Sequence, residues 1–205
     1  MKPKYWNKGK LYLSKKDNTL KSIISIYSKE FLSTNDNHFH CLINSIIGQQ
    51  ISVNAANSIK NKFFSLKKNI TPLSIIKIKN SDLRKIGLSK QKVIYVKNIS
   101  SFFIKNKDFI KKIRHYHEDE IKEKLISIKG IGPWTVDMFL IFALGKQNIL
   151  PIGDLGLIKA ISISYKKKLP ISEKNLIKFY EKWKPYNTIA TWYLWRSLDP
   201  LPISY

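Results

Sequence analysis

Helical periodicity is the feature that most constrains the fold of this 205-residue chain. Apolar side chains recur every three or four residues, as in the run from Leu20 to Phe31, and this spacing gives a helix one apolar face. Similar patterns predict helices at residues 20–31, 39–47, 55–63, 89–99, 109–113, 118–128, 133–144, 154–165, 172–183 and 187–198, with a short one opening at Thr71-Pro72 and a turn around residues 83–86 capped by Ser81. No segment alternates with a sustained period of two. The sequence therefore predicts an all-α protein.

The chain is long enough for one domain or two small lobes, because about 70% of the unfolded surface becomes buried at this size. The breakers at residues 35–37, Gly87, Gly145 and Pro185 are short, and none has the composition of a flexible linker. No apolar run reaches the ~18 residues of a membrane span, and the first ten residues lack the apolar core of a secretory signal. We therefore expect an intracellular protein with no membrane partner, in the cytoplasm or nucleoid.

The single cysteine, Cys41, excludes an internal disulfide and any all-cysteine metal or iron–sulfur site. It lies in an apolar run and is expected to be a small buried side chain. His38, His40, His115 and His117 lack metal-ligand spacing and are predicted to be surface or loop residues. We expect no metal and no cofactor.

The charge is strongly basic, with 37 lysines and arginines against 14 acidic residues and a net charge of +23. Such an excess favours a polyanionic partner. However, only Arg84, Arg114 and Arg196 are arginines, and a lysine-rich composition also fits an ordinary solvated surface. Nucleic acid is favoured as the partner because the charge occurs together with the following motif.

A glycine hairpin, Gly130-Ile131-Gly132-Pro133, lies between two apolar-periodic segments. A helix is expected to end near Ile128, the chain to turn where φ is positive, and a second helix to begin at Pro133, which lacks the N–H that would have no partner there. The N–H groups at that helix start, with Lys129 beside them, favour binding of a phosphate.

The segment KGIGPWTVDMF resembles the helix-hairpin-helix of the HhH-GPD superfamily of DNA glycosylases. PIGDLGLIK is similar to that superfamily's loop and catalytic aspartate, and SIIGQQISVNAA and LRKIGLSKQKVIYVKNIS resemble segments of its DNA-3-methyladenine glycosylase II branch. The similarity runs from about Trp6 to Trp195. It implies two helical lobes with a DNA cleft between them, approximately residues 38–132 and residues 1–37 with 133–205, with the hairpin at about residues 128–134.

Asp154 is the carboxylate to which the resemblance assigns catalysis. Its position before an apolar-periodic segment would also suit an ordinary helix N-cap, and the two roles are compatible. A carboxylate beside the deoxyribose stabilises the positive charge that forms as the N-glycosidic bond breaks, and it orients the attacking water. Asp137, in the middle of the preceding helix, is the rival carboxylate, and a surface or supporting role is favoured for it.

Trp134 occupies the place where superfamily members that also cleave the backbone carry a lysine, which attacks the sugar. The resemblance therefore implies a monofunctional enzyme in which water is the nucleophile. It also places Trp134, Met138 and Trp195 around the flipped base, with an aromatic residue in some relatives where this chain has Met138. Trp183, Trp192 and Tyr193 have helical spacing typical of core residues, and a core position is the alternative for Trp195.

Gln50 is expected to be the wedge that fills the gap left by the flipped nucleotide, although a plain polar residue at a helix start is the alternative. Gln49 and Ser52 are expected to make structural or backbone contacts. Lys129, Gly130, Gly132 and Thr135 are expected to bind the DNA backbone, and the resemblance leaves open a monovalent cation on the hairpin carbonyls.

Together these features predict a monomeric, monofunctional DNA glycosylase that excises N-alkylated purines such as 3-methyladenine from double-stranded DNA. Two alternatives stay open: a glycosylase of the same fold for deaminated or oxidised bases, and a non-catalytic helix-hairpin-helix DNA-binding protein.

Overall fold

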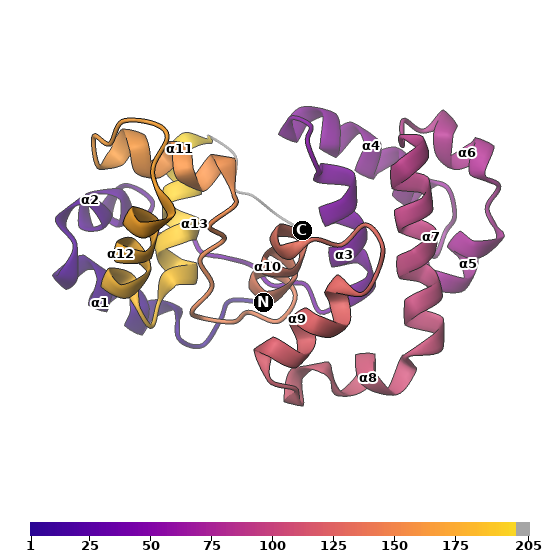
Figure 1. Ribbon diagram of the computed structural model, residues 1–205, viewed down its shortest axis with the longest axis horizontal. Helices are drawn as coiled ribbons and strands as arrows, with labels where there is room; N and C mark the ends of the chain where they lie inside the picture. Colours follow the sequence, from indigo (N-terminus) through magenta and orange to yellow (C-terminus); the bar gives the residue numbers. More distant parts are fainter. Residues whose placement is uncertain (200–205) are drawn as a thin grey trace. The chain divides into compact units, whose positions relative to one another are not determined.

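The computed structural model describes residues 1–199, and helices are the only regular elements in this part of the chain (Figure 1). The described residues form two compact units: unit 1 comprises residues 1–35 and 140–199, and unit 2 comprises residues 36–139. The helices of unit 1 are α1 (Trp6–Lys16), α2 (Asn18–Ile26), α11 (Leu155–Ser164), α12 (Glu173–Trp183) and α13 (Asn187–Leu198). Those of unit 2 are α3 (His38–Gly48), α4 (Val53–Ser65), α5 (Pro72–Lys77), α6 (Asn80–Lys85), α7 (Lys90–Lys105), α8 (Lys107–Lys112), the 3-10 helix η1 (Ile113–His115) and α9 (Glu118–Ile126). No helix among the described residues is both long and apolar enough to cross a bilayer.

Helix α10 (Pro133–Phe142) contains the division between the units, which falls after Phe139 rather than at 132/133 as the sequence indicated. The reason lies in the bonds at its two ends. Thr135, in the first turn, accepts a hydrogen bond from Gln49 of unit 2, whereas the carbonyl of Phe142 accepts one from the Asn35 N–H of unit 1.

Unit 1 is built around α13, which packs against α1, α2, α11 and α12. Residues 187–195 are buried without interruption, and Trp192 meets Trp6 edge-on at 5.3 Å between ring centroids. Trp183, Trp192 and Tyr193 are at most 2% exposed, which confirms the core positions predicted for them. This aromatic packing fixes the position of α13, the helix that contains Trp195.

Helix α1, which contains Gly9, was absent from the sequence prediction, in which the first helix begins at Leu20. Its glycine is required by packing, since a Cβ on Gly9 would lie 2.2 Å from Cδ1 of Ile189. At the other end of this region, α2 ends at Ile26, so the predicted extension to Phe31 is wrong; Leu32 is buried and Phe31 is exposed.

Unit 2 is organised by α7, which packs against α3 and α5 (Figure 1). Its residues Val93, Val96 and Ile99 are buried. Cys41 is fully buried on α3, as expected, and burial raises the pKa of its thiol to about 12. Ser81 is not a cap: α6 begins one residue earlier, and no side chain caps it.

Two histidines of unit 2 are packing residues rather than surface residues, which corrects the sequence prediction. The His38 ring meets Phe139 at 5.6 Å, and burial is the main cause that lowers the pKa of His38. His40 lies 4.7 Å from the Phe64 ring, with Nε2 2.9 Å from the carbonyl oxygen of Ile70.

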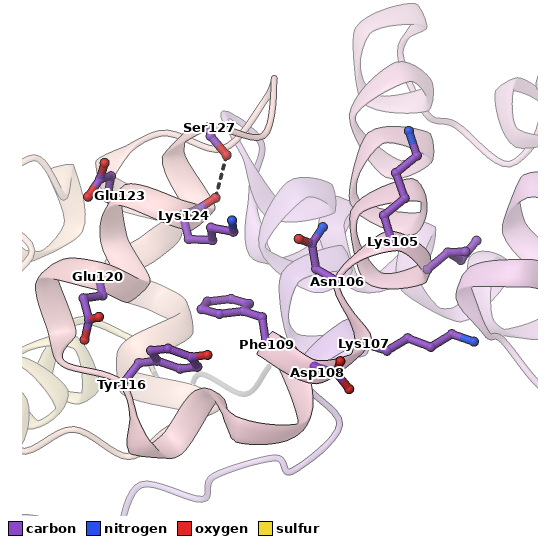
Figure 2. A pocket seen from close by; sticks show the side chains of 11 residues that line it. Lys105, Asn106, Lys107, Asp108, Phe109, Tyr116, Glu120, Glu123, Lys124 and Ser127 are labelled. Carbon is purple, nitrogen blue, oxygen red and sulfur yellow. Dashed lines mark hydrogen bonds between the residues drawn. The ribbon is translucent and has the colours of Figure 1, made fainter.

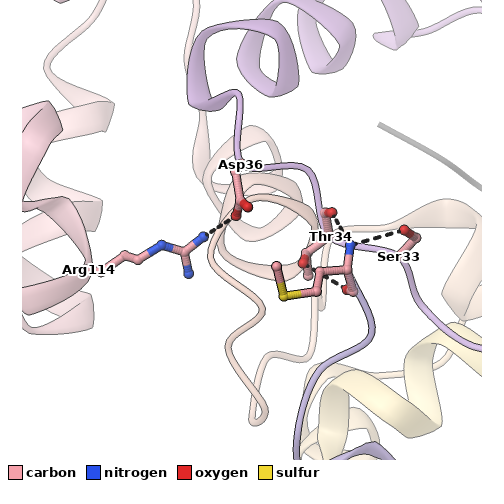
Figure 3. Close-up of polar contacts among 5 residues, drawn as sticks. Ser33, Thr34, Asp36 and Arg114 are labelled. Atoms are coloured by element: carbon pink, nitrogen blue, oxygen red, sulfur yellow. Dashed lines mark hydrogen bonds and ion pairs between the residues drawn. The ribbon is translucent and has the colours of Figure 1, made fainter.

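The chain first passes from unit 1 to unit 2 between Asn35 and Asp36, and each side of this point is fastened within its own unit (Figure 3). In unit 1, the backbone N–H of Thr34 donates to the Met1 carbonyl at 2.9 Å. In unit 2, the Arg114 guanidinium donates to Asp36 at 2.7 Å, with both side chains largely exposed. An exposed pair of this kind adds at most about 1 kcal/mol.

Candidate functional site in two parts

The hairpin of unit 2 contains two glycines with different reasons for being glycine. Gly130 has φ +108°, and a Cβ there would lie 2.2 Å from the Tyr95 ring, so both the backbone and the space require glycine. Gly132 has no atom within 4 Å of an added Cβ. The fold alone would accept a side chain at Gly132, which leaves that position open to close approach by a ligand.

Side chains from outside the hairpin hold its carbonyl groups. Asn98 on α7 donates from Nδ2 to the Lys129 carbonyl at 3.1 Å, and Gln49 donates from Nε2 to the Gly130 carbonyl at 3.3 Å. The Lys129 side chain itself is exposed. The hairpin backbone is therefore fixed from within unit 2, while its cation faces solvent.

The first turns of α10 carry three residues that the sequence assigned to DNA or base binding. Trp134 is half-buried, which leaves part of its indole accessible. Thr135 is 1% exposed and its hydroxyl accepts from Gln49 at 3.0 Å, so its side chain is enclosed by the fold. The DNA-backbone role assigned to it stays a prediction. Met138 is also 1% exposed, and its place in a base pocket stays a prediction.

The 49–52 loop, between α3 and α4, presents Gln50. This residue is exposed and has φ 56°, a left-handed conformation that few residues other than glycine adopt. Ser52 then caps α4, accepting from the Ala55 N–H at 3.3 Å. The structural roles predicted for Gln49 and Ser52 are confirmed by these bonds, whereas the wedge role of Gln50 stays a prediction.

Asp154 lies in unit 1 as the N-cap of α11. Its Oδ1 accepts from the Leu157 backbone N–H at 2.6 Å, which confirms the predicted cap. The same oxygen accepts from the indole Nε1 of Trp195 at 2.8 Å. Two donors from separate helices thus fix the orientation of a half-buried carboxylate.

Trp195 is held in turn by its own packing. It is 4% exposed, and its ring stacks on Phe142 at 6.0 Å with an interplanar angle of 12°. The sequence indicated a choice between base pocket and core for this residue. The structure shows a third function, as the hydrogen-bond donor that orients Asp154.

Gly156 leaves room for this arrangement. A Cβ there would lie 3.1 Å from Oδ1 of Asp154 and 3.6 Å from Cδ1 of Trp195. A side chain there would press on the carboxylate, whereas its distance from the indole is that of an ordinary van der Waals contact. Gly156 was not among the predicted site residues, although its position two residues after Asp154 was a visible signal.

The other carboxylates are placed differently. Asp17 is 3% exposed in unit 1, and its Oδ2 accepts from Tyr165 at 2.8 Å, from Trp183 at 3.0 Å and from Lys182 at 2.8 Å. Burial alone would raise the pKa of Asp17, but these bonds outweigh burial and hold that pKa below its usual value. Asp17 therefore joins α2 to α12 and is enclosed by the fold. Asp137, half-buried in the middle of α10, caps no helix.

A pocket of about 830 Å³ lies elsewhere on unit 2 and is lined by residues from the end of α7, from α8 and from α9 (Figure 2). Its walls include Phe109 and Tyr116, with ring centroids 5.0 Å apart, and the carboxylates of Asp108, Glu120 and Glu123. Lys105, Lys107 and Lys124 line the pocket as well, so its charges balance and it has no positive excess that would attract a DNA phosphate.

Charge is unevenly distributed along unit 2. Residues 37–107 contain thirteen lysines and arginines and one acidic residue, Asp82, whereas residues 108–123 contain five acidic residues. Arg114 and Arg196, two of the three arginines, bind Asp36 and Glu30 within the protein. Within residues 37–107, the cations available to a polyanion are therefore lysines apart from Arg84.

No cluster of three or more histidine, cysteine or acidic side chains in residues 1–199 has the geometry to hold a metal ion. The candidate functional features are therefore a hairpin and an exposed glutamine in unit 2 and, separately, an oriented carboxylate in unit 1.

The model of the HhH-GPD superfamily of base excision DNA repair proteins matches residues 43–185. The chain belongs to this superfamily. The matched range includes the 49–52 loop, the hairpin and Asp154.

DNA-3-methyladenine glycosylase 1 of Schizosaccharomyces pombe is 30% identical over 201 residues, which cover 93% of this chain and 86% of that protein. A putative DNA-3-methyladenine glycosylase of Bacillus subtilis, YfjP, is 30% identical over 78% of this chain, which spans 59% of that protein's length. Among solved structures, the S. pombe 3-methyladenine DNA glycosylase Mag1 in complex with abasic DNA has a TM-score of 0.83 and 28% identity, covering 93% of this chain and 96% of that one.

Proposed function

We propose that this HhH-GPD protein is a monofunctional DNA glycosylase that removes N-alkylated purines such as 3-methyladenine from double-stranded DNA. The observation that carries the proposal is the Asp154 carboxylate, oriented by Leu157 and Trp195 at a helix N-terminus. A protein that only binds DNA would need the helix cap but not the second donor, the Trp195 indole, that orients the carboxylate. The names of the relatives support the same substrate class.

In the proposed reaction the bond between the sugar carbon C1′ and the purine nitrogen breaks, and its electron pair leaves with the base. Positive charge develops on the deoxyribose, and the negative charge of Asp154 stabilises it. Water adds its oxygen to C1′ and gives up a proton. The products are a free purine and an abasic site, and no oxidant, metal or cofactor enters the balance.

Water is the proposed nucleophile because Trp134 stands where related lyases carry a lysine. An indole cannot form a Schiff base with the sugar. It offers an aromatic face instead, and a cationic alkylated purine gains about 0.5–2 kcal/mol from such a face. Borohydride is accordingly expected to trap no protein–DNA adduct at an abasic site above background, and efficient trapping would contradict the monofunctional assignment.

Binding to the duplex is proposed to come from unit 2. The hairpin supplies backbone N–H groups beside Gly132 and the cation of Lys129, and lysines along residues 37–107 add phosphate contacts. Gln50 is proposed to fill the space left by the flipped nucleotide and to meet the orphaned base. A monomer is sufficient for these roles.

The test is base release from duplex DNA treated with a methylating agent, with the released bases identified by mass. The proposal predicts that 3-methyladenine leaves at rates far above spontaneous loss. Release of only deaminated or oxidised bases from matching duplexes would favour a glycosylase of the same fold for another lesion. Tight duplex binding without release of any base would favour a DNA-binding protein.

A further inference from the structure

One face of α7 carries three residues that contact the two DNA-binding segments of unit 2. Lys92, Tyr95 and Asn98 follow one another at intervals of three, which places them along the same side of the helix. Lys92 contacts the end of α3 and the 49–52 loop, Tyr95 lies beneath Gly130, and Asn98 binds the Lys129 carbonyl. A single rigid helix therefore supports the loop that bears Gln50 and the hairpin.

Lys92 uses its ammonium group inside the protein. Nζ donates to the carbonyls of Ile47 and Gln49, at 2.8 Å each, where α3 ends. A cation at this position also complements the negative end of the helix. Burial lowers the pKa of Lys92, as expected for an ammonium group partly removed from water.

Gln49 joins the two segments directly. Its Nε2 donates to the Gly130 carbonyl at 3.3 Å and to the Thr135 hydroxyl at 3.0 Å. Because a carbonyl only accepts hydrogen bonds, the amide nitrogen rather than the amide oxygen must face Gly130. The residue immediately before Gln50 is thus fastened to the hairpin, 81 residues further along the chain.

Gln50 needs such support. Its left-handed backbone is costly for a residue with a side chain, and its side chain is exposed and so receives little help from packing. The hydrogen bonds made by Gln49 and to its carbonyl by Lys92 oppose relaxation of the Gln50 backbone to an ordinary conformation. They also keep Gln50 at a fixed distance from the phosphate-binding hairpin.

We propose that Gln49 and Lys92 are positioning residues that set the spacing between the wedge and the hairpin, so that the protein prefers DNA with a vacant nucleotide position. This inference rests on the proposed function, in which Gln50 is the wedge. Neither residue touches the reacting atoms. Their effect is expected in the ratio of affinities for abasic and undamaged duplex, rather than in affinity for DNA in general.

Lys97 provides a matched control. It lies on the same helix, and its ammonium group also donates to two carbonyls at a helix end, those of Ile76 and Ile78, at 2.8 and 2.6 Å. Lys97→Met and Lys92→Met therefore remove the same chemistry from α7. Only Lys92 supports the 49–52 loop.

The experiment measures affinity for an abasic duplex and for the undamaged duplex of the same sequence, with thermal unfolding measured in parallel. Loss of a supporting hydrogen bond is expected to lower the abasic-to-undamaged ratio about 3- to 10-fold in Gln49→Ala and Lys92→Met. Lys97→Met should destabilise the fold comparably and change the ratio less than about twofold. Equal changes in the ratio for Lys92→Met and Lys97→Met would overturn the inference.

A double-mutant cycle tests whether Gln49 acts through Gln50. In the Gln50→Ala background, adding Gln49→Ala should change the ratio little, since the wedge is already absent. Full additivity would show that Gln49 acts independently of Gln50 and would contradict the proposal. A wild-type protein with no preference for the abasic duplex would overturn it as well.

These outcomes are independent of base release. A protein that excises 3-methyladenine but gives an additive cycle would retain the proposed function and lose the positioning role. Conversely, a coupled cycle in a protein that releases no base would retain the positioning role and remove the glycosylase assignment.

Discussion

The candidate features of the two units are held in place in different ways. In unit 1 a single carboxylate is held by a buried indole and a helix N-terminus, so its position is fixed by side-chain packing. In unit 2 a glycine hairpin and an exposed glutamine are held through carbonyl groups by Gln49, Lys92 and Asn98. One part presents charge, and the other presents backbone and shape. The rate of base release and the affinity for DNA should therefore respond to different substitutions.

The largest difference between the effect on base release and the effect on DNA affinity is expected for Asp154→Asn. Asparagine still caps a helix, so folding and duplex binding should change little, while the negative charge is lost. Loss of charge stabilisation costs on the order of 3–4 kcal/mol, or roughly 100- to 1000-fold in the rate of base release. An intrinsically labile base such as 7-methylguanine should lose less. Full activity in Asp154→Asn, with activity lost in Asp137→Asn, would move the catalytic role to Asp137.

Salt is expected to weaken the duplex binding that is proposed for unit 2. If about five phosphates are neutralised, log K for undamaged duplex should fall with log salt at a slope near −4.5, so that doubling the salt weakens binding about 20-fold. Titration of a labelled duplex across a salt series measures this slope. A slope near zero would show that the lysines of unit 2 do not contact DNA.

The substitution Trp195→Phe tests how the Asp154 carboxylate of unit 1 is oriented. Phenylalanine keeps a ring to stack on Phe142 but removes the N–H that orients Asp154. Loss of a charge-assisted hydrogen bond predicts a fall of roughly 10-fold in single-turnover rate, with abasic-duplex affinity unchanged. An equal fall in affinity would instead indicate that the indole touches the base.

Gly132→Ala should give the smallest effect, on affinity alone. The fold has room for the methyl group, so the melting temperature should stay near that of the wild type. If a phosphate approaches this backbone closely, duplex affinity should fall about 3- to 10-fold through lost N–H contacts. Gly153→Ala is the control, because its added Cβ also meets no atom within 4 Å. Unchanged affinity in Gly132→Ala would show that no phosphate approaches the Gly132 backbone closely.

Local signals in the sequence were sufficient for much of this account. The apolar spacing predicted most helices, the Gly-x-Gly-Pro pattern predicted the hairpin, and the residues after Asp154 predicted its cap. Helix α1 was not predicted, and the packing of its Gly9 against Ile189 cannot be read from local spacing. Contacts between distant residues supply what local spacing cannot.

The supporting bonds of the site belong to this second class. Trp195 donates to a residue 41 positions earlier, and Gln49 to carbonyl and hydroxyl groups more than 80 positions later. No periodicity relates such pairs. The distinction between Gly130 and Gly132 likewise depends on where the Tyr95 ring lies, which only the folded chain reveals.

The central claim is that Asp154 acts in bond cleavage and the hairpin acts in DNA binding. The most direct test is the single-turnover rate of 3-methyladenine release, measured over increasing protein concentration for Asp154→Asn and Gly132→Ala beside the wild type. We expect the Gly132 variant to approach the wild-type rate once protein is saturating, because only binding is weakened. The Asp154 variant should stay roughly 100- to 1000-fold slower at every concentration. If saturation restores the Asp154 variant to the wild-type rate, the carboxylate serves binding rather than bond cleavage, and the account is wrong.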